Sequence, residues 1–473
     1  MKSISRLLVL GASLITLASC SEETADTPKV ELKNYSVTPA LVKGLPSGVE
    51  AYSIISSDDK LPESPAFIFG GSADGSGLLK NSDGTFTFLV NNEDNFSVSR
   101  ITFDNTFKPV KGDYALNSDG GQWRLCSATL ATPDEHGFGP TFLTCGESGE
   151  ESMTHAVNPT GAMNSSQTLP AFGRFSAENA MPLPMNAYSG KTVIVITDDD
   201  SGPYGGQVAL YVANSVGDLS GGSLYLLARD NGDQREKNMI AGTSYPVTFK
   251  KVDNVPSLTG KQINETTVPA LQAMKFGRVE DVDYRKGGAG REVYFTVTGQ
   301  AYSSANADSS RTKYGRVYKL VLDASDPTKG TLECILDGDD RAGIAGKFQN
   351  PDNICVTTNY VYVQEDANGY GDETHDAYIY QYNIASKTMS VVMELDHKRG
   401  DAKYNVGGDS KFGAWEYGAM IDVSSQLGID NVFMLCIQPH TWNGDAYKNP
   451  DGGTKRPNEA QASQILVIKG LPR

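Results

Sequence analysis

The sequence predicts an all-β protein, a β-propeller that forms a single large domain over residues 46–473. Short runs of β-branched and aromatic residues recur along the chain, as in residues 192–197 and 292–298, and clusters of Asn, Asp and Gly separate them. Amphipathic helical patterns are scarce. Because a long all-β chain must protect its sheet edges, closure into a ring of blades with about four strands each fits best. No clean repeat fixes the number of blades.

The first 19 residues have the three parts of a bacterial secretory signal. Two basic residues precede an apolar run over residues 7–17, which is shorter than the roughly 20 residues that cross a bilayer. The run ends on Leu-Ala-Ser-Cys, which resembles the lipobox of bacterial lipoproteins, so residues 1–19 are the expected signal peptide and Cys20 the lipidation site. An ordinary secretion signal with a chance cysteine is the alternative.

The residues after Cys20 predict a lipid-anchored location at the outer membrane or cell surface. Ser-Glu-Glu follows the cysteine and resembles the export tag of Bacteroidetes surface lipoproteins. Residues 20–45 are polar and suit a tether between the lipid and the domain. We expect the lipid to be the protein's only attachment to the membrane, and we expect a monomer.

Composition excludes several classes of function. The formal net charge is −16, and removal of the two basic residues of the signal lowers it by two more. So acidic a chain is a poor nucleic-acid binder, and it would repel an anionic substrate unless bound cations inverted the local field. The five histidines lack the close pairing of a zinc hydrolase site. With Cys20 lipidated, an odd number of five cysteines remains, so at least one thiol has no disulfide partner within the chain.

Glycine-rich motifs carry no phosphate-binding signal here. The segment Gly70-Gly-Ser-Ala-Asp-Gly and the segment Lys286-Gly-Gly-Ala-Gly lack the strand and helix that flank a phosphate loop, so both are interpreted as turns.

The residues that could carry chemistry are acidic groups, one cysteine and one arginine in short separate segments. In chain order these segments are Leu89-Val-Asn-Asn-Glu-Asp, Cys126-Ser-Ala-Thr, Gly139-Pro-Thr-Phe-Leu-Thr-Cys-Gly-Glu, Phe172-Gly-Arg-Phe-Ser-Ala-Glu, Arg278-Val-Glu-Asp-Val, Gln349-Asn-Pro-Asp-Asn-Ile and Val361-Tyr-Val-Gln-Glu-Asp. Carboxylates are hard ligands that suit calcium and ferric iron, and one thiolate favours a transition metal.

In that order and spacing, over about residues 70–440, the segments resemble the PhoX family of alkaline phosphatases. The resemblance implies a propeller whose central pocket holds two Fe(III) ions and several Ca²⁺ ions and hydrolyses small phosphate monoesters. Arg278 would contact the substrate phosphate, with Glu280 beside it as the second catalytic residue. The implied iron and calcium ligands are Glu93, Cys126, Glu147, Glu178 and Glu280, with Cys126 bridging the irons. Looser candidates for calcium are Asp198, Asp199, Asp352 and Asp366.

Departures from the family pattern leave other interpretations open. Asn92, Ala177 and Val279 replace a His, a His and a Pro, which puts substrate preference and rate in doubt more than metal binding. Glu93, Glu147, Asp198, Asp199 and Asp352 could lie in turns. Cys126 could be a buried thiol or a disulfide partner of Cys145, and Arg278 with Glu280 could be a surface ion pair.

Two other functions are therefore alternatives to the phosphatase. One is a non-catalytic propeller lipoprotein that binds a ligand for a transporter. The other is a phytase-like or lactonase-like calcium hydrolase.

Overall fold

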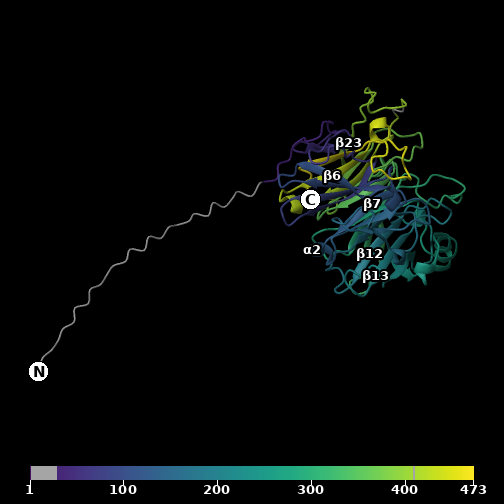
Figure 1. Ribbon diagram of the computed structural model, residues 1–473. Coiled ribbons are helices and arrows are strands. Elements are labelled where there is room, and N and C mark those ends of the chain that lie inside the picture. The colour runs from purple at the N-terminus through teal and green to yellow at the C-terminus, as the bar shows by residue number, and fades with distance from the viewer. Residues whose placement is uncertain (2–28, 409–410) are drawn as a thin grey trace.

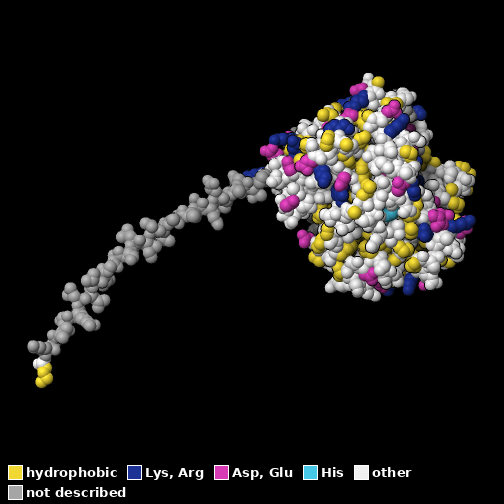
Figure 2. Space-filling view, in the orientation of Figure 1, with side chains coloured by type: hydrophobic (Ala, Val, Ile, Leu, Met, Phe, Trp, Pro, Cys, Tyr) yellow, Lys and Arg dark blue, Asp and Glu magenta, His cyan; other side chains and the backbone are white. Residues whose placement is uncertain are grey.

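The structure is a computed structural model that describes Met1 and residues 29–408 and 411–473 (Figure 1). Cys20 and, apart from Met1, the expected signal peptide lie outside the described residues. No helix in the described part of the chain is long and apolar enough to span a membrane. On the face seen in Figure 2, basic side chains are scattered among acidic ones and form no continuous basic surface.

Nearly all regular structure is β, in six antiparallel blades. Blade 1 is β3 (Ala73–Lys80), β4 (Phe86–Asn92), β5 (Ser97–Phe103) and β6 (Pro109–Leu116). Blade 2 is β7 (Leu125–Ala131), β8 (Thr141–Gly146), β9 (His155–Val157) and β10 (Gln167–Thr168). Blade 3 is β11 (Ala177–Pro182), β12 (Thr192–Asp198), β13 (Val208–Ala213) and β14 (Ser223–Arg229).

The second half of the chain repeats the arrangement. Blade 4 is β16 (Val279–Tyr284), β17 (Glu292–Val297), β18 (Arg316–Leu322) and β19 (Lys329–Asp337). Blade 5 is β20 (Pro351–Val356), β21 (Tyr360–Glu365), β22 (Tyr378–Asn383) and β23 (Thr388–Leu395). Blade 6 is β24 (Glu416–Asp422), β25 (Val432–Gln438), β26 (Gln464–Lys469) and β2 (Glu50–Ser56).

Two further strands and a few helical turns complete the fold. β15 (Ser244–Lys251) pairs with β14 and β19 and so joins blades 3 and 4 into one sheet of nine strands. β1 (Val42–Lys43) pairs with the outer strand of blade 5. The helical turns are α1 (Ser118–Gly121), α2 (Pro133–His136), α3 (Gly260–Gln262), α4 (Val268–Leu271), α5 (Ser424–Leu427), η1 (Pro170–Phe172), η2 (Glu236–Asn238), η3 (Val255–Ser257), η4 (Ile263–Thr267) and η5 (Asp445–Tyr447).

In each blade, the first strand named above faces a central channel. In blade 6 this strand is β24, and the outermost strand is β2 from the N-terminal part of the chain. The channel strands contact one another in the order β3, β7, β11, β16, β20 and β24, and β24 contacts β3 again. One hydrophobic cluster lies between each pair of neighbouring blades. The prediction of an all-β propeller in one large domain is confirmed, and the structure fixes six blades.

Both ends of the chain close the ring. β2 pairs antiparallel with β26, from Glu50 with Lys469 to Ser56 with Gln464, so the purple and yellow segments of Figure 1 lie side by side. The domain also begins earlier than residue 46. Leu41 is fully buried, and its N–H donates to Oε1 of Gln464 at 3.0 Å. The described residues 35–45 of the predicted tether therefore pack on the domain.

Every channel strand has a bulge near its start. In five of them the pairing skips from the first residue to the fourth, as in β7, which pairs with β8 at Leu125 and next at Ala128. In β24 the skip runs from Tyr417 to Met420. A bulge interrupts the ladder and re-aims the side chains within it. In the five strands with the first pattern, the side chains of the second and third residues therefore point in other directions than they would in a regular strand.

Gly75, the third residue of β3, lets blades 1 and 2 approach closely. A Cβ there would lie 2.3 Å from the nitrogen of Ala128 and 2.5 Å from the carbonyl oxygen of Cys126. We expect Gly75→Ala to force β3 from β7 and to lower the free energy of unfolding by about 1–3 kcal/mol in urea titrations. Gly288→Ala is the control, because no heavy atom lies within 4 Å of its Cβ position. Equal stability of the two variants would contradict this account of the contact.

Candidate metal centre

One end of the channel carries a ring of ligand groups. The second residue of five channel strands is acidic or a thiol, and Glu416, the first residue of β24, adds a sixth member. The five are Asp74, Cys126, Glu178, Glu280 and Asp352. Because each lies within or beside a strand bulge, the six blades contribute one group each to the same cavity.

These side chains line a cavity of about 200 Å³. Three more carboxylates reach it from the segments after β4, β8 and β21, namely those of Glu93, Glu147 and Asp366. The cavity is thus lined by eight carboxylates and one thiol, and its basic lining residues are Arg124, Arg278 and His440. Such a surplus of negative charge in a small space calls for bound cations.

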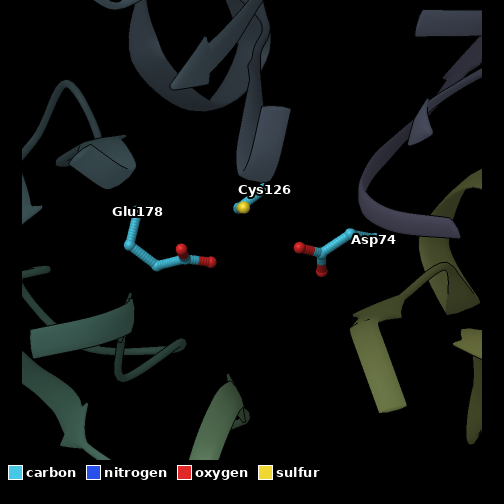
Figure 3. A group of neighbouring side chains, drawn as sticks. All are labelled: Asp74, Cys126 and Glu178. Atoms are coloured by element: carbon cyan, nitrogen blue, oxygen red, sulfur yellow. The ribbon is translucent and has the colours of Figure 1, made fainter. Parts of the chain in front are cut away.

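The ligand atoms fall into four groups, each with all its atoms within 4.8 Å of one another. These groups are Asp74–Cys126–Glu178, Glu93–Cys126–Glu147, Glu178–Glu280–Asp352 and Asp352–Asp366–Glu416. Figure 3 shows the first, in which the sulfur of Cys126 and the carboxylates of Asp74 and Glu178 point toward a common centre. Cys126, Glu178 and Asp352 each belong to two groups, so the four positions form a continuous chain of sites.

Cys126 is free of disulfides and buried, as are the other four cysteines in the described part of the chain. Its Sγ lies 3.0 Å from Oε2 of Glu147 and donates to it. Burial, and then the negative charge of Glu147, raises the pKa of this thiol well above its ordinary value. A bound metal would reverse that preference, because a cysteine ligand is deprotonated. The disulfide with Cys145 that the sequence left open does not form in the structure, because both thiols are free.

The carboxylates are held in an environment that disfavours their charge. Burial, reinforced by neighbouring carboxylates, raises the pKa of Asp74, Glu147, Glu280, Asp352 and Glu416 well above the usual range. Burial also raises the pKa of Glu178 to about 8. Oδ1 of Asp74 is buried and accepts no hydrogen bond among the described residues, and Oε1 of Glu280 is buried with only the ion pair to Arg278 at 3.2 Å. Lone pairs left without donors in a buried site are suited to a cation.

Arg278 lies at the rim but is largely engaged. Its Nε and one terminal nitrogen donate to the two oxygens of Asp199 at 2.7 and 3.1 Å, and the other terminal nitrogen donates to Asn368 at 2.6 Å. The terminal nitrogen of Arg278 that donates to Asp199 also lies 3.2 Å from Oε1 of Glu280. The pair Arg278–Glu280 is therefore not the surface ion pair considered from the sequence, because Glu280 is buried.

A polar layer lies next to the ring of ligand groups and includes the third residues of β11 and β16, Asn179 and Asp281. Asp281 accepts from Nδ2 of Asn179 at 2.6 Å and from the N–H of Ile354 at 3.1 Å, which ties together blades 3, 4 and 5. Burial raises the pKa of Asp281 to about 7. Asn179 and Asp281 also line a second cavity of about 160 Å³ further along the channel. The two cavities thus lie in successive layers along the channel and are lined by different residues.

The sequence candidates divide into three sets. Those brought together around the cavity are Glu93, Cys126, Glu147, Glu178, Arg278, Glu280, Asp352 and Asp366. Asp199 accepts hydrogen bonds from Arg278 and does not itself line the cavity. Asp198 ends β12 as a buried carboxylate and lies outside the cavity lining, so it is no solvated turn.

Sequence reasoning missed Asp74, Glu416, Arg124 and His440. The interpretation of Gly70-Gly-Ser-Ala-Asp-Gly as a turn is wrong at its end, because β3 begins at Ala73 and carries Asp74 into the cavity. Nε2 of His440 lies within hydrogen-bond distance of Oε1 of Glu416, at 2.9 Å. The signal that could have found Asp74 is a ligand residue preceded by an apolar residue and followed by small or polar ones, as in Leu-Cys-Ser-Ala and Ala-Glu-Asn-Ala.

A sequence model of the family described as "Alkaline phosphatase PhoX" matches residues 154–411, more than half of the chain. The chain belongs to this family. PhoX proteins are metal-dependent alkaline phosphatases, so the chain is a PhoX-type phosphatase, and the predicted family and enzyme class are confirmed. No curated protein matches the sequence.

The fold of PhoX is also found among solved structures. The chain is similar to Pseudomonas fluorescens PhoX in complex with vanadate, a transition state analogue, at 13% identity and a TM-score of 0.63, covering 93% of this chain and 98% of that one. It is less similar to a Fusarium graminearum α-L-arabinofuranosidase, at 11% identity and a TM-score of 0.41, with coverages of 89% and 98%. At this identity the first match shows the propeller fold.

The three departures from the family pattern do not thin out the ligand set. Asn92, Ala177 and Val279 are buried in the blades and lie outside the lining of the cavity. Asn92 donates to the carbonyl of Gly70 at 3.1 Å and accepts from Ser99, so it serves the loop before β3. The carboxylates and the thiol around the cavity are present despite these changes.

Proposed function

We propose that this PhoX protein hydrolyses extracellular phosphate monoesters through an iron and calcium centre held at the end of its channel. The observation that carries the proposal is the shared position of Cys126 in two neighbouring ligand groups. A single thiol among eight carboxylates favours a transition metal at its own position and hard cations elsewhere.

The residues present fit such a centre. Cys126 with Glu93, Glu147, Asp74 and Glu178 would hold iron, since these are the groups that share the thiol. The all-carboxylate groups, Glu178–Glu280–Asp352 and Asp352–Asp366–Glu416, would hold calcium. Bound together, these cations would polarise the phosphoryl oxygens, supply an activated oxygen nucleophile and stabilise the leaving group.

The chain's own residues would hold and shield this centre. Arg278 fixes Asp199 and lies beside Glu280, so it orients a carboxylate that faces the cavity. His440 contacts Glu416 through one ring nitrogen and Gln461 through the other, which fixes the position of that carboxylate. Asn179 donates to Asp281 in the next layer of the channel, and this hydrogen bond links blades 3 and 4 beside the ligand groups.

A lipid on Cys20 would hold the enzyme at the outer membrane or cell surface, where small phosphorylated compounds are its substrates. The lipobox-like Leu-Ala-Ser-Cys supports this location. Mass spectrometry of the mature N-terminus tests it, because a diacylated Cys20 is the expected first residue. An unmodified N-terminus elsewhere would overturn the anchor.

The activity is tested with protein purified without chelators, assayed on a panel of phosphate monoesters and diesters after measurement of its metals by plasma mass spectrometry. We expect iron and calcium, and turnover of monoesters in preference to diesters. Full metal content with tight phosphate binding and no turnover on any monoester would instead identify a non-catalytic binding protein.

A further inference from the structure

Two arginines line the cavity, and they stand at matching places in the sixfold repeat. Arg124 precedes Cys126 by two residues, and Arg278 precedes Glu280 by two residues. Each therefore comes directly before a channel strand and reaches the same cavity from a different blade. They are the only Arg or Lys side chains among the residues that line it.

The two guanidinium groups differ in how many donors they have left. A guanidinium carries five N–H groups. Arg278 directs three of them to Asp199 and Asn368 and holds Glu280 as an ion pair, and its side chain is 22% exposed. Arg124 makes one side-chain hydrogen bond to a described residue, from a terminal nitrogen to Oε1 of Glu93 at 2.9 Å. Four of its N–H groups are left for a ligand.

Arg124 is also the better placed of the two at the mouth. Its side chain is 47% exposed, about twice the exposure of Arg278. Its backbone is fixed, because its N–H donates to Oγ of Ser148 at 2.8 Å and its carbonyl accepts from the N–H of Glu147 at 2.8 Å. A planar fork on a fixed backbone matches two oxygens of a phosphoryl group.

We propose that Arg124 binds the non-bridging phosphoryl oxygens of the substrate at the mouth of the cavity, and that Arg278 is a positioning residue for Asp199 and Glu280. The inference rests on the proposed phosphatase function. It assigns to Arg124 the phosphate contact that the family resemblance assigns to Arg278.

The test is binding of inorganic phosphate to the purified, metal-containing protein, measured by isothermal titration calorimetry. We expect Arg124→Gln to raise the Kd for phosphate by about tenfold or more, since hydrogen bonds to a charged group are lost. Arg124→Lys should recover only part of the affinity, because an ammonium cannot form the fork. Arg278→Gln should change the Kd by less than about threefold if Arg124 makes the main contact.

Arg235→Gln is the matched control, because Arg235 is an exposed arginine outside the cavity lining, near Asp308. Metal content is measured for every variant, so that a loss of metal is not mistaken for a loss of phosphate contacts. Unchanged phosphate affinity in Arg124→Gln with full metal content would overturn the inference, as would a larger loss in Arg278→Gln.

The same variants separate this inference from the function on which it rests. If the unaltered protein binds phosphate through Arg124 but hydrolyses no monoester, the phosphatase proposal fails and the role of Arg124 stands. If the protein hydrolyses monoesters and Arg124→Gln leaves both KM and the Kd for phosphate unchanged, the inference alone fails. A raised KM with little change in kcat supports it, because the lost contact then acts mainly on substrate binding.

Discussion

A Cys126→Ala variant is expected to lose its transition metal and, with it, phosphatase activity. Cys126 belongs to both groups that contain a sulfur ligand, so its removal leaves only carboxylates at each position. Loss of a ligand should cost at least the 10–100-fold that loss of an outer-shell partner costs, so we expect kcat/KM to fall by about 100-fold or more. Metal analysis by plasma mass spectrometry and steady-state kinetics measure the two effects.

Cys145→Ala is the control for this experiment. Cys145 is a fully buried thiol on β8, and its Sγ lies 3.3 Å from Oγ1 of Thr154, away from the cavity. This variant should lose some stability and keep its metals. Iron bound to Cys126→Ala in the same amount as to the unaltered protein would rule out the thiol as a ligand.

Removal of the metals is expected to destabilise the protein strongly, and more so at high pH. Without cations the buried carboxylates must take up protons or repel one another. Burial raises the pKa of Glu178 from 4.5 to about 8, so the folded state binds more protons than the unfolded state between these values. The free energy of unfolding of the metal-free protein is therefore greatest below about 4.5 and falls as the pH rises through about 8.

Thermal unfolding with and without a chelator at pH 5 and pH 8 tests this linkage. At pH 8 we expect the chelator to lower the Tm by about 10 °C, because several ions that bind only the folded state are lost together. At pH 5 the effect should be smaller, since protons replace the cations in part. A chelator effect of equal size at both pH values would contradict the carboxylate account, and added calcium and iron should restore the Tm.

The fold could be predicted from strand patterning because the runs and turns are local signals. The expected run over residues 192–197 lies in β12, and the expected run over residues 292–298 contains β17, which ends at Val297. The blade count was not accessible, because neighbouring blades share a shape and little sequence. The pairing of β2 with β26, more than 400 residues apart, also leaves no local signal.

The site could be predicted only where segments resembled a family. Glu93, Cys126 and Glu147 were found in this way, and the structure places them in one group. Asp74 was missed because the glycines around it suggest a turn. One of them, Gly75, instead permits the close approach of the backbone of β7. Glu416 follows an aromatic residue and lies outside the segments that the resemblance marked. Nothing in the sequence around Arg124 marks it as a functional residue. Its proposed role rests on the side-chain donors that make no hydrogen bond to the described residues of the structure.

The pairing of β2 with β26 closes the ring, and the assembly of the ligand site depends on this closure. Asp74 is delivered by blade 1 and Glu416 by blade 6, and these blades become neighbours only when β2 has paired with β26. A chain without β26 still contains every ligand residue, because Glu416 precedes this strand, but its blade 6 lacks the strand that joins β25 to β2. Assembly of the closed ring therefore requires the pairing of β2 with β26, and a truncated chain that lacks residues 464–473 would lose all of β26 and with it this pairing. The ligand groups of blades 1 and 6 are thus held together by a strand pairing between residues 50–56 and 464–469.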